Sequence, residues 1–179
     1  SGDGRFVAFE SSSSELVSGD TSGSGDIFLR ETGANTTVLV SHAYGGGPAN
    51  GPSYSPAISA DGCHVAFTSP ASNLVADDTN GVADVFLYHC EDQSIERVSI
   101  SSDETQAEGS DSRSYHAAIS GDGSLVVFES AAANLDSKRH WCFKATTRAQ
   151  VAAFHAAGLA NGGKDDGALP VAACGLLHP

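Results

Sequence analysis

Three carboxylates and one carboxamide crowd the stretch VADDTNGVAD at residues 75–84. Asp78, Asn80 and Asp84 stand at positions 1, 3 and 7 of a loop in which Gly81 allows the chain to bend. Such oxygen atoms suit Ca²⁺, which takes about 6–8 oxygen ligands. The alternative is a simple turn, in which Asp78 and Asn80 form Asx turns and Asp84 caps the next strand. We favour calcium at this loop and keep the turn as the alternative.

The same arrangement occurs once more, earlier in the chain. Asp20, Ser22 and Asp26 occupy the corresponding places, with a serine where the later loop has an asparagine. Recurrence of the two aspartates fits a metal site and a turn equally well. Asp20 and Asp26 are therefore further candidate calcium ligands, although this set is poorer and we favour the turn here.

Both loops belong to an internal repeat. The segment SGDGRFVAFESSSSELVSGDTSGSGDIFLRET, from Ser1, aligns without gaps with SADGCHVAFTSPASNLVADDTNGVADVFLYHC, from Ser59. A third copy, SGDGSLVVFESAAANL, begins at Ser120. Related segments precede the later copies, SYSPAIS at Ser53 and SYHAAIS at Ser114. A repeat of this length indicates that the chain builds one structural unit several times.

Each unit is predicted to contain four short strands separated by turn residues. In the complete second unit the expected strands span about 54–59, 63–69, 84–90 and 95–100. The second and third of these are rich in valine and aromatic residues, as is typical of strands buried on both faces. Four-stranded units in tandem favour an all-β fold of propeller blades stacked face to face.

The repeat resembles a known family. The pattern from Pro56 to Phe86, PAISADGCHVAFTSPASNLVADDTNGVADVF, is similar to the TolB-like, WD-related β-propeller repeat of bacterial envelope and secreted proteins. The resemblance covers about residues 1–136. It implies a β-propeller and an extracytoplasmic location, periplasmic or secreted. It implies no single activity, because propellers carry many functions.

The number of blades is too small for a closed ring. The chain has about two and a half, because the first strand of the first blade and the last two of the third are missing. Closed propellers have about 4–8 blades. Open blade edges and faces are prone to associate. We therefore expect self-association that completes a ring, as a dimer or a trimer, unless the chain is a fragment.

The tail, residues 137–179, departs from the repeat. A strand at 140–145 and a helix at 148–160 are expected. The segment 139–168 resembles part of a glyoxalase/bleomycin-resistance domain, in whose metal-dependent members the strand histidine, here His140, is a ligand. The rest of that module is missing, so we expect no working glyoxalase site and treat the tail as a possibly chimeric appendage.

Charge and composition restrict the partners. Residues 1–136 carry 20 acidic and 4 basic side chains, whereas 137–179 carry 2 acidic and 5 basic. The acidic body repels phosphate backbones, so no nucleic-acid partner is expected. No apolar run approaches the roughly 18–20 residues of a membrane span, so we expect none. The change in sign also places a domain boundary near residue 136.

Two of the four cysteines stand at the ends of expected neighbouring strands. Cys63 opens one strand and Cys90 closes the next, which brings them within reach of a disulfide. In an exported protein we expect that bridge, and in the cytosol two buried thiols. No C-x-x-C pair is present, which disfavours a zinc ribbon.

The sequence supports three functional hypotheses. The first is a module that binds calcium and serves in binding to, and assembly with, other chains. The second is a calcium-dependent hydrolase of lactones or other small esters, in which the metal polarises the carbonyl and a carboxylate or histidine moves the proton. His116, which stands where the preceding repeat has Ser55, is its weak candidate base, although it also fits a polar residue at the rim. The third is an inactive chimeric fragment.

Overall fold

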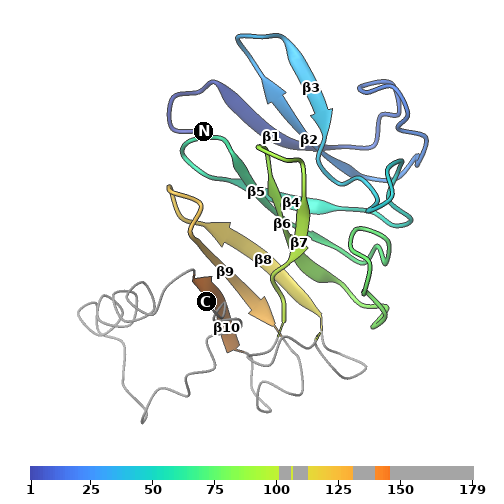
Figure 1. The fold of residues 1–179 in the computed structure, drawn as a ribbon, viewed down its shortest axis with the longest axis vertical. Coiled ribbons are helices and arrows are strands. Elements are labelled where there is room, and N and C mark those ends of the chain that lie inside the picture. The colour runs from blue at the N-terminus through green and yellow to red at the C-terminus, as the bar shows by residue number, and fades with distance from the viewer. Residues whose placement is uncertain (101–105, 107–112, 131–139, 146–179) are drawn as a thin grey trace.

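The structure is a computed structural model that describes residues 1–100, 106 and 113–130, together with the backbone of 140–145. All regular elements in these ranges are strands, arranged in three antiparallel sheets that follow one another along the molecule (Figure 1). Sheet 1 contains β1 (Phe6–Ser11), β2 (Asp26–Glu31) and β3 (Thr36–Leu39). Sheet 2 contains β4 (Tyr54–Ile58), β5 (His64–Ser69), β6 (Asp84–His89) and β7 (Ile95–Arg97). Sheet 3 contains β8 (Ser114–Ile119), β9 (Leu125–Ser130) and β10 (His140–Ala145).

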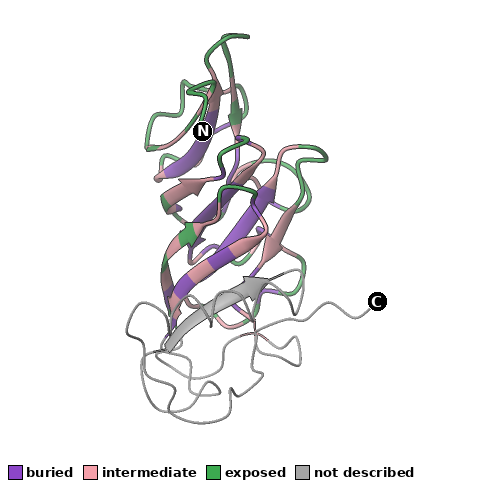
Figure 2. Cartoon of the chain, turned by 90° about the vertical axis from the view of Figure 1, so that its left-hand side faces the viewer, coloured by how far each residue is buried: buried purple, intermediate pink, exposed green. Residues whose placement is uncertain are grey.

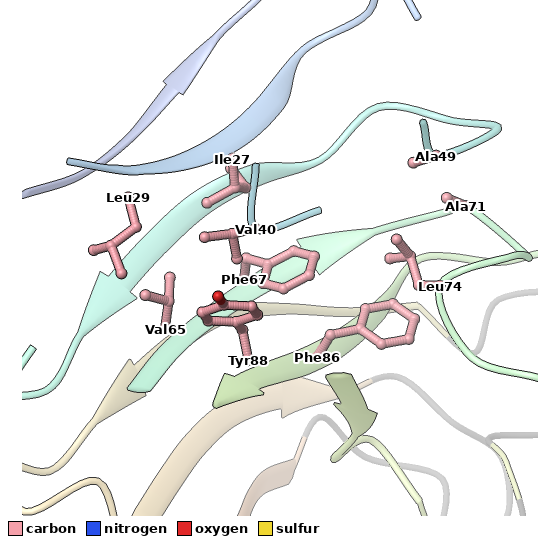
Figure 3. Close-up of a cluster of buried hydrophobic side chains, with 10 residues drawn as sticks. All are labelled: Ile27, Leu29, Val40, Ala49, Val65, Phe67, Ala71, Leu74, Phe86 and Tyr88. Carbon is pink, nitrogen blue, oxygen red and sulfur yellow. The ribbon is translucent and has the colours of Figure 1, made fainter. Parts of the chain in front are cut away.

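Sheet 2 is buried on both faces because it lies between the other two sheets. Along β5, Val65 and Phe67 pack with sheet 1, whereas Ala66, between them, packs with sheet 3. The neighbouring β6 alternates in the same way, with Phe86 toward sheet 1 and Leu87 toward sheet 3. Figure 3 shows the first of these clusters, and Figure 2 shows buried segments in the middle of the stack. The predicted burial on both faces is confirmed, and its cause is stacking of like units.

Backbone hydrogen bonds repeat at both junctions between sheets. The Gly2 N–H donates to the Ala60 carbonyl at 2.8 Å, and the Ala60 N–H donates to the Gly121 carbonyl at the same distance. A second pair follows the same rule: Ser53 donates to Gly25 at 2.7 Å and Ser114 to Ala83 at 2.8 Å. In each pair of hydrogen bonds, the two donor residues occupy equivalent positions of successive repeats, and so do the two acceptor residues. The same junction is therefore built twice.

Side chains repeat at the junctions too. Phe6 lies against Gly62, and His64, its counterpart in sheet 2, lies against Gly123. Both glycines have positive φ angles, of 81° and 72°, and a Cβ on either would lie within 2.9 Å of the ring-bearing side chain opposite. Two equivalent junctions between antiparallel sheets of one repeating design define an incomplete β-propeller. This confirms the predicted fold class and the presence of four strands in the second unit, of which the last, β7, ends at Arg97 and not near residue 100 as predicted.

Sheet 3 contains one strand more than the repeat predicted. β10, from the segment after the repeat, pairs with β9 so that His140 lies opposite Ser130. The equivalent residue of sheet 2, Ser69, lies opposite Asp84. The predicted strand at 140–145 is thus confirmed, and it takes the position that β6 takes in sheet 2. The expected helix at 148–160 lies outside the described residues.

Within the described part of the chain, none of the elements is a helix with the length and apolarity that a membrane crossing requires.

Candidate functional site

Asp84 is the centre of a buried polar network in sheet 2. It is the first residue of β6 and is fully buried. The Ser99 hydroxyl donates to Oδ1 of Asp84 at 2.5 Å, and the Asn80 amide donates to Oδ2 at 2.9 Å. Ser99 Oγ also accepts the Val85 N–H at 3.1 Å, which ties the network to the backbone of β6. The carboxylate therefore already has partners on both oxygens.

Asp78 lies in the same loop and faces the guanidinium group of Arg97. Nη1 of Arg97 lies 3.3 Å from Oδ1 of Asp78, and the two side chains are only 11% and 1% exposed. Neither carboxylate oxygen of Asp78 accepts a hydrogen bond of good geometry. The same guanidinium donates to the Asp77 carbonyl at 3.3 Å and to Oε1 of Gln106 at 3.2 Å. Arg97 thus supplies, from within the fold, positive charge of the kind that a metal ion would bring.

Burial dominates the electrostatics of this loop. It raises the pKa of Asp78 above its ordinary value, an effect that the Arg97 charge opposes. Burial also raises the pKa of Asp84, while the hydrogen bonds from Ser99 and Asn80 work against the rise. The charge on Asp78 adds to the increase at Asp84, because two nearby carboxylates resist being ionised together. Both groups therefore carry an energetic cost when ionised.

The corresponding loop of sheet 1 is built in the same way without the arginine. Ser22 Oγ bridges two buried carboxylates, lying 2.5 Å from Oδ2 of Asp26 and 3.3 Å from Oδ1 of Asp20. Ser41, the counterpart of Ser99, donates to Oδ1 of Asp26 at 2.8 Å. Leu39 stands at the position equivalent to Arg97, since it pairs with β2 as Arg97 pairs with β6. Among the described residues, none of the ion pairs includes Asp20 or Asp26.

The two loops fit calcium to different degrees. Each offers two carboxylates and one further side-chain oxygen, so carbonyls and water would have to complete a shell of about 6–8 oxygens. No group of three or more His, Cys, Asp or Glu that could hold a metal ion occurs in the described ranges. The loops differ in that a described ion pair, between Asp78 and Arg97, includes a carboxylate of the second loop, whereas none of the described ion pairs includes Asp20 or Asp26. Calcium binding stays a prediction at both.

His116 lies on the first strand of sheet 3, in an irregular position. Its φ angle is 53°, and Ser55, its counterpart in β4, has a φ angle of 56°. Pairing with the neighbouring strand shifts register at this point in both sheets. The imidazole is 74% exposed, and its Nδ1 lies 3.6 Å from Oε2 of Glu129. His116 is therefore accessible and has a carboxylate beside it, and its role as a base stays a prediction.

The predicted disulfide is present. Cys63 and Cys90 are bonded across neighbouring strands, with their Cα atoms 4.9 Å apart. His64 and His89 lie opposite each other next to the bridge, with their rings edge to face and 5.2 Å between centroids. A pocket of about 350 Å³ opens beside Cys63 and the two histidines. For His140 the structure gives only the backbone position, so its predicted ligand role is untested.

The outer face of sheet 1 has no sheet packed on it in the described structure. We define this face by Val7, Phe9, Leu16 and Phe28. Their counterparts in sheet 2 are Val65, Phe67, Leu74 and Phe86, and all four are buried against sheet 1. Val7 is 46% exposed and Leu16 is 41% exposed, whereas Phe9 is partly buried and Phe28 is already fully buried. The outer face is therefore a copy of a surface that is covered one unit further along the chain.

The residues that support the two loops were not among the candidates predicted from the sequence. Ser41 and Ser99 hold the aspartates and occupy the same position of the repeat, so the repeat contained the signal that could have found them. The repeat gave no signal for Arg97, because the equivalent residue in the first unit is Leu39. The separation of Arg97 from Asp78 along the chain does not predict that the two side chains are in contact.

No family model matches the chain, and no curated protein matches it. Among solved structures, it is similar to a TolB-type protein from Agrobacterium tumefaciens, with 17% identity, a TM-score of 0.49 and coverage of 81% of this chain and 43% of the other. It is also similar to the β-propeller domain of the Trilobed protease from Pyrococcus furiosus, with 15% identity, a TM-score of 0.47 and coverage of 79% and 36%. TolB from Acinetobacter baumannii matches with 14% identity, a TM-score of 0.35 and coverage of 80% and 39%. The chain spans less than half the length of these structures, and the comparisons lend no support to the glyoxalase resemblance.

Proposed function

We propose that this chain is a propeller-type binding and assembly module, which takes up another sheet on the outer face of sheet 1. The observation that carries the proposal is the equivalence of that face with the covered face of sheet 2. Val65, Phe67, Leu74 and Phe86 are all buried by the sheet before them. The same four positions in sheet 1 carry residues of the same apolar kind.

The geometry of the outer face is already that of a buried surface. The rings of Phe9 and Phe28 are stacked with centroids 5.6 Å apart and planes 24° apart. Phe67 and Phe86 are stacked at 5.7 Å and 27° inside the junction. No rearrangement of this pair is needed before a sheet docks, which lowers the entropic cost of association.

Exposed aliphatic side chains supply the driving force. Complete burial of a valine or leucine side chain stabilises by about 1.5–3 kcal/mol. Val7 and Leu16 are a little under half exposed, so each would contribute a fraction of that amount on docking. A surface of this kind supports association of modest strength, and the affinity depends on the rest of the partner sheet.

Sedimentation equilibrium over a wide concentration range tests the proposal. We expect the wild-type chain to associate, and Val7→Asp and Leu16→Asp to weaken association, because a carboxylate cannot be buried there without a partner. Tyr44→Asp is the matched control, since Tyr44 is 73% exposed and lies outside the outer face. A wild-type chain that stays monomeric at every concentration, or a control variant that associates as weakly as Val7→Asp, would contradict the proposal.

Two further proposals accompany this function. Calcium binding is supported best at Asp20 and Asp26, whose buried carboxylates have no cation among the described ion pairs. An extracytoplasmic location is supported by the bond between Cys63 and Cys90, because disulfides persist in oxidising compartments.

A further inference from the structure

Two histidines face each other across the middle sheet. His64 in β5 lies directly opposite His89 in β6, and their ring centroids are 5.2 Å apart. In the adjacent pair, the Cys90 N–H donates to the Cys63 carbonyl at 2.8 Å. Hydrogen-bonded and non-hydrogen-bonded pairs alternate along antiparallel strands, so the histidines form a non-hydrogen-bonded pair, the kind in which side chains lie closer. The fold thus holds two imidazoles side by side on one face of sheet 2.

The repeat does not require imidazole at either position. In sheet 1 the equivalent pair is Phe6 opposite Glu31, and in sheet 3 it is Leu125 opposite Ala145. The same place in the fold therefore accepts aromatic, acidic and aliphatic residues. Packing of one sheet on the next does not account for a histidine on both strands of sheet 2.

One nitrogen of each ring lies near a carboxylate. Nε2 of His89 is 3.2 Å from Oε1 of Glu96, and Nδ1 of His64 is 3.8 Å from Oδ1 of Asp61. Nδ1 of His64 is also buried, and it lies against Gly123. A proton on the nitrogen that faces the carboxylate leaves the lone pair on the other nitrogen. Nε2 of His64 and Nδ1 of His89 are therefore the nitrogens left to bind a ligand.

The histidines border a pocket that carries negative charge. The pocket has a volume of about 350 Å³, and Cys63, Ser94, Glu91 and Asp92 complete its lining. Glu91 and Asp92 are exposed, and hydrogen bonds from Ser94 hold the pKa of Asp92 below its ordinary value. Clefts lined by charge of one sign concentrate ions of the opposite sign. The pocket therefore favours a cation next to the two imidazoles.

We propose that His64 and His89 together bind one divalent transition-metal ion, of the class of Zn²⁺, Ni²⁺ and Cu²⁺, at this pocket. Imidazole nitrogen suits these metals. Two imidazoles on one tetrahedral zinc ion, each with a Zn–N distance of about 2.0–2.1 Å, have centroids roughly 5 Å apart. The separation of 5.2 Å between His64 and His89 matches that geometry.

The rest of the shell and its support come from the surroundings. Within the residues that the structure describes, no group of three or more His, Cys, Asp or Glu is placed to hold a metal ion, so water completes the shell. Glu96 and Asp61 are positioning residues, because a carboxylate behind a ligand histidine fixes its tautomer and ring orientation. The disulfide between Cys63 and Cys90 ties the two strands together beside the ligands. This nitrogen site is separate from the calcium loops and from the outer face of sheet 1, so each proposal can fail alone.

Paramagnetic broadening by Cu²⁺ locates the ion. Copper(II) chloride is added in sub-stoichiometric steps to the full chain, without a reducing agent, so that the disulfide persists. Amide signals are recorded residue by residue. We expect the signals of His64, His89 and Ser94 to broaden first. Signals of His64 and His89 that stay sharp at one equivalent of Cu²⁺ would overturn the proposal.

A Zn²⁺ titration of four variants tests the roles of the residues. Affinity is read from the ring signals of His64 and His89, so zinc bound elsewhere on the chain does not enter the measurement. His64→Phe introduces the residue of the equivalent position in sheet 1, and His89→Gln removes the other ligand. We expect each to weaken binding by about tenfold or more, and Glu96→Gln to weaken it by about 10–100-fold, the usual effect of losing the carboxylate behind a ligand histidine.

His116→Gln is the matched control. His116 also lies beside a carboxylate, that of Glu129, but its described ring contact is with Tyr115 and not with a second histidine. This variant should bind Zn²⁺ as the wild type does. The amide spectra show which variants keep the fold. Equal zinc affinity in the wild type and in folded His64→Phe or His89→Gln would reduce the pair to a packing contact and overturn the proposal.

Discussion

Nη1 of Arg97 lies 3.3 Å from Oδ1 of Asp78, and the protein buries both side chains almost completely. This ion pair distinguishes the loop of Asp78 and Asp84 from the loop of Asp20 and Asp26, although the two loops have similar sequences. In sheet 2 an arginine neutralises one of two buried aspartates, whereas in sheet 1 a leucine stands in its place. The two loops therefore differ in whether the fold supplies a positive charge beside their buried carboxylates.

Arg97→Met should destabilise the protein strongly. Removing one partner of a buried ion pair leaves an uncompensated charge, at a cost of about 3–5 kcal/mol. The double variant Arg97→Met with Asp78→Asn should recover part of this loss, since neither member of the pair then carries a charge. Urea unfolding of the four proteins in this cycle gives the coupling free energy. Strictly additive losses would show that the two groups do not interact.

The raised pKa values of Asp84 and Asp78 predict how stability depends on pH. A carboxyl group whose pKa is higher in the folded state binds more protons there than in the unfolded chain, so its contribution weakens as pH rises. The change falls between the ordinary value of 3.8 and the raised pKa of the folded group. We expect the free energy of unfolding of the wild type, relative to Asp84→Asn, to rise as pH falls through this window. Denaturant titrations at several pH values measure it, and a difference that falls instead would contradict the assignment.

Gly62→Ala should cost more than Gly4→Ala. Both glycines have positive φ angles, of 81° and 71°, so each substitution carries a similar backbone cost of about 1 kcal/mol. A Cβ on Gly62 meets Phe6, whereas a Cβ on Gly4 meets nothing within 4 Å. Overpacking at Gly62 adds about 1–3 kcal/mol. Thermal unfolding of the two variants checks the difference, and equal losses would mean that Phe6 moves aside freely.

Calcium should stabilise the protein through the loop of sheet 1. A ligand that binds only the folded state raises the melting temperature, by an amount that grows with its concentration. We expect Asp20→Asn with Asp26→Asn to abolish the increase that calcium causes. The matched control is Asp78→Asn with Asp84→Asn. This variant should keep more of the calcium-induced increase in melting temperature, because Arg97 already places a positive charge beside that loop. A melting temperature that does not change on addition or chelation of calcium would reduce both loops to turns.

The hydrolase alternative predicts turnover of simple lactones in the presence of calcium. His116→Ala should then lower kcat by about 10²–10⁴-fold if its imidazole moves the proton. The substitution should leave the fold intact because the side chain is largely exposed. Absence of any lactone or ester hydrolysis by the wild type, assayed with calcium and with a chelator, would eliminate this alternative.

Much of the architecture could be predicted from local patterns. The gap-free alignment that sets Phe9 against Phe67 and Asp26 against Asp84 defined the units, and the valine-rich and aromatic runs marked the strands. The bond between Cys63 and Cys90 followed from their places at the ends of neighbouring strands. Repeats, turn glycines and strand periods are local properties of the chain, so the residues by themselves determined this much.

The tertiary structure decided everything that depends on which units meet. It placed Arg97 beside Asp78 and put β10 next to β9 in sheet 3. Among the described residues, it also left the outer face of sheet 1 without a sheet packed on it. These outcomes depend on contacts between residues far apart in the chain, formed as like sheets bury one another's faces. The repeat says that such faces exist, and only the folded arrangement shows which of them are covered.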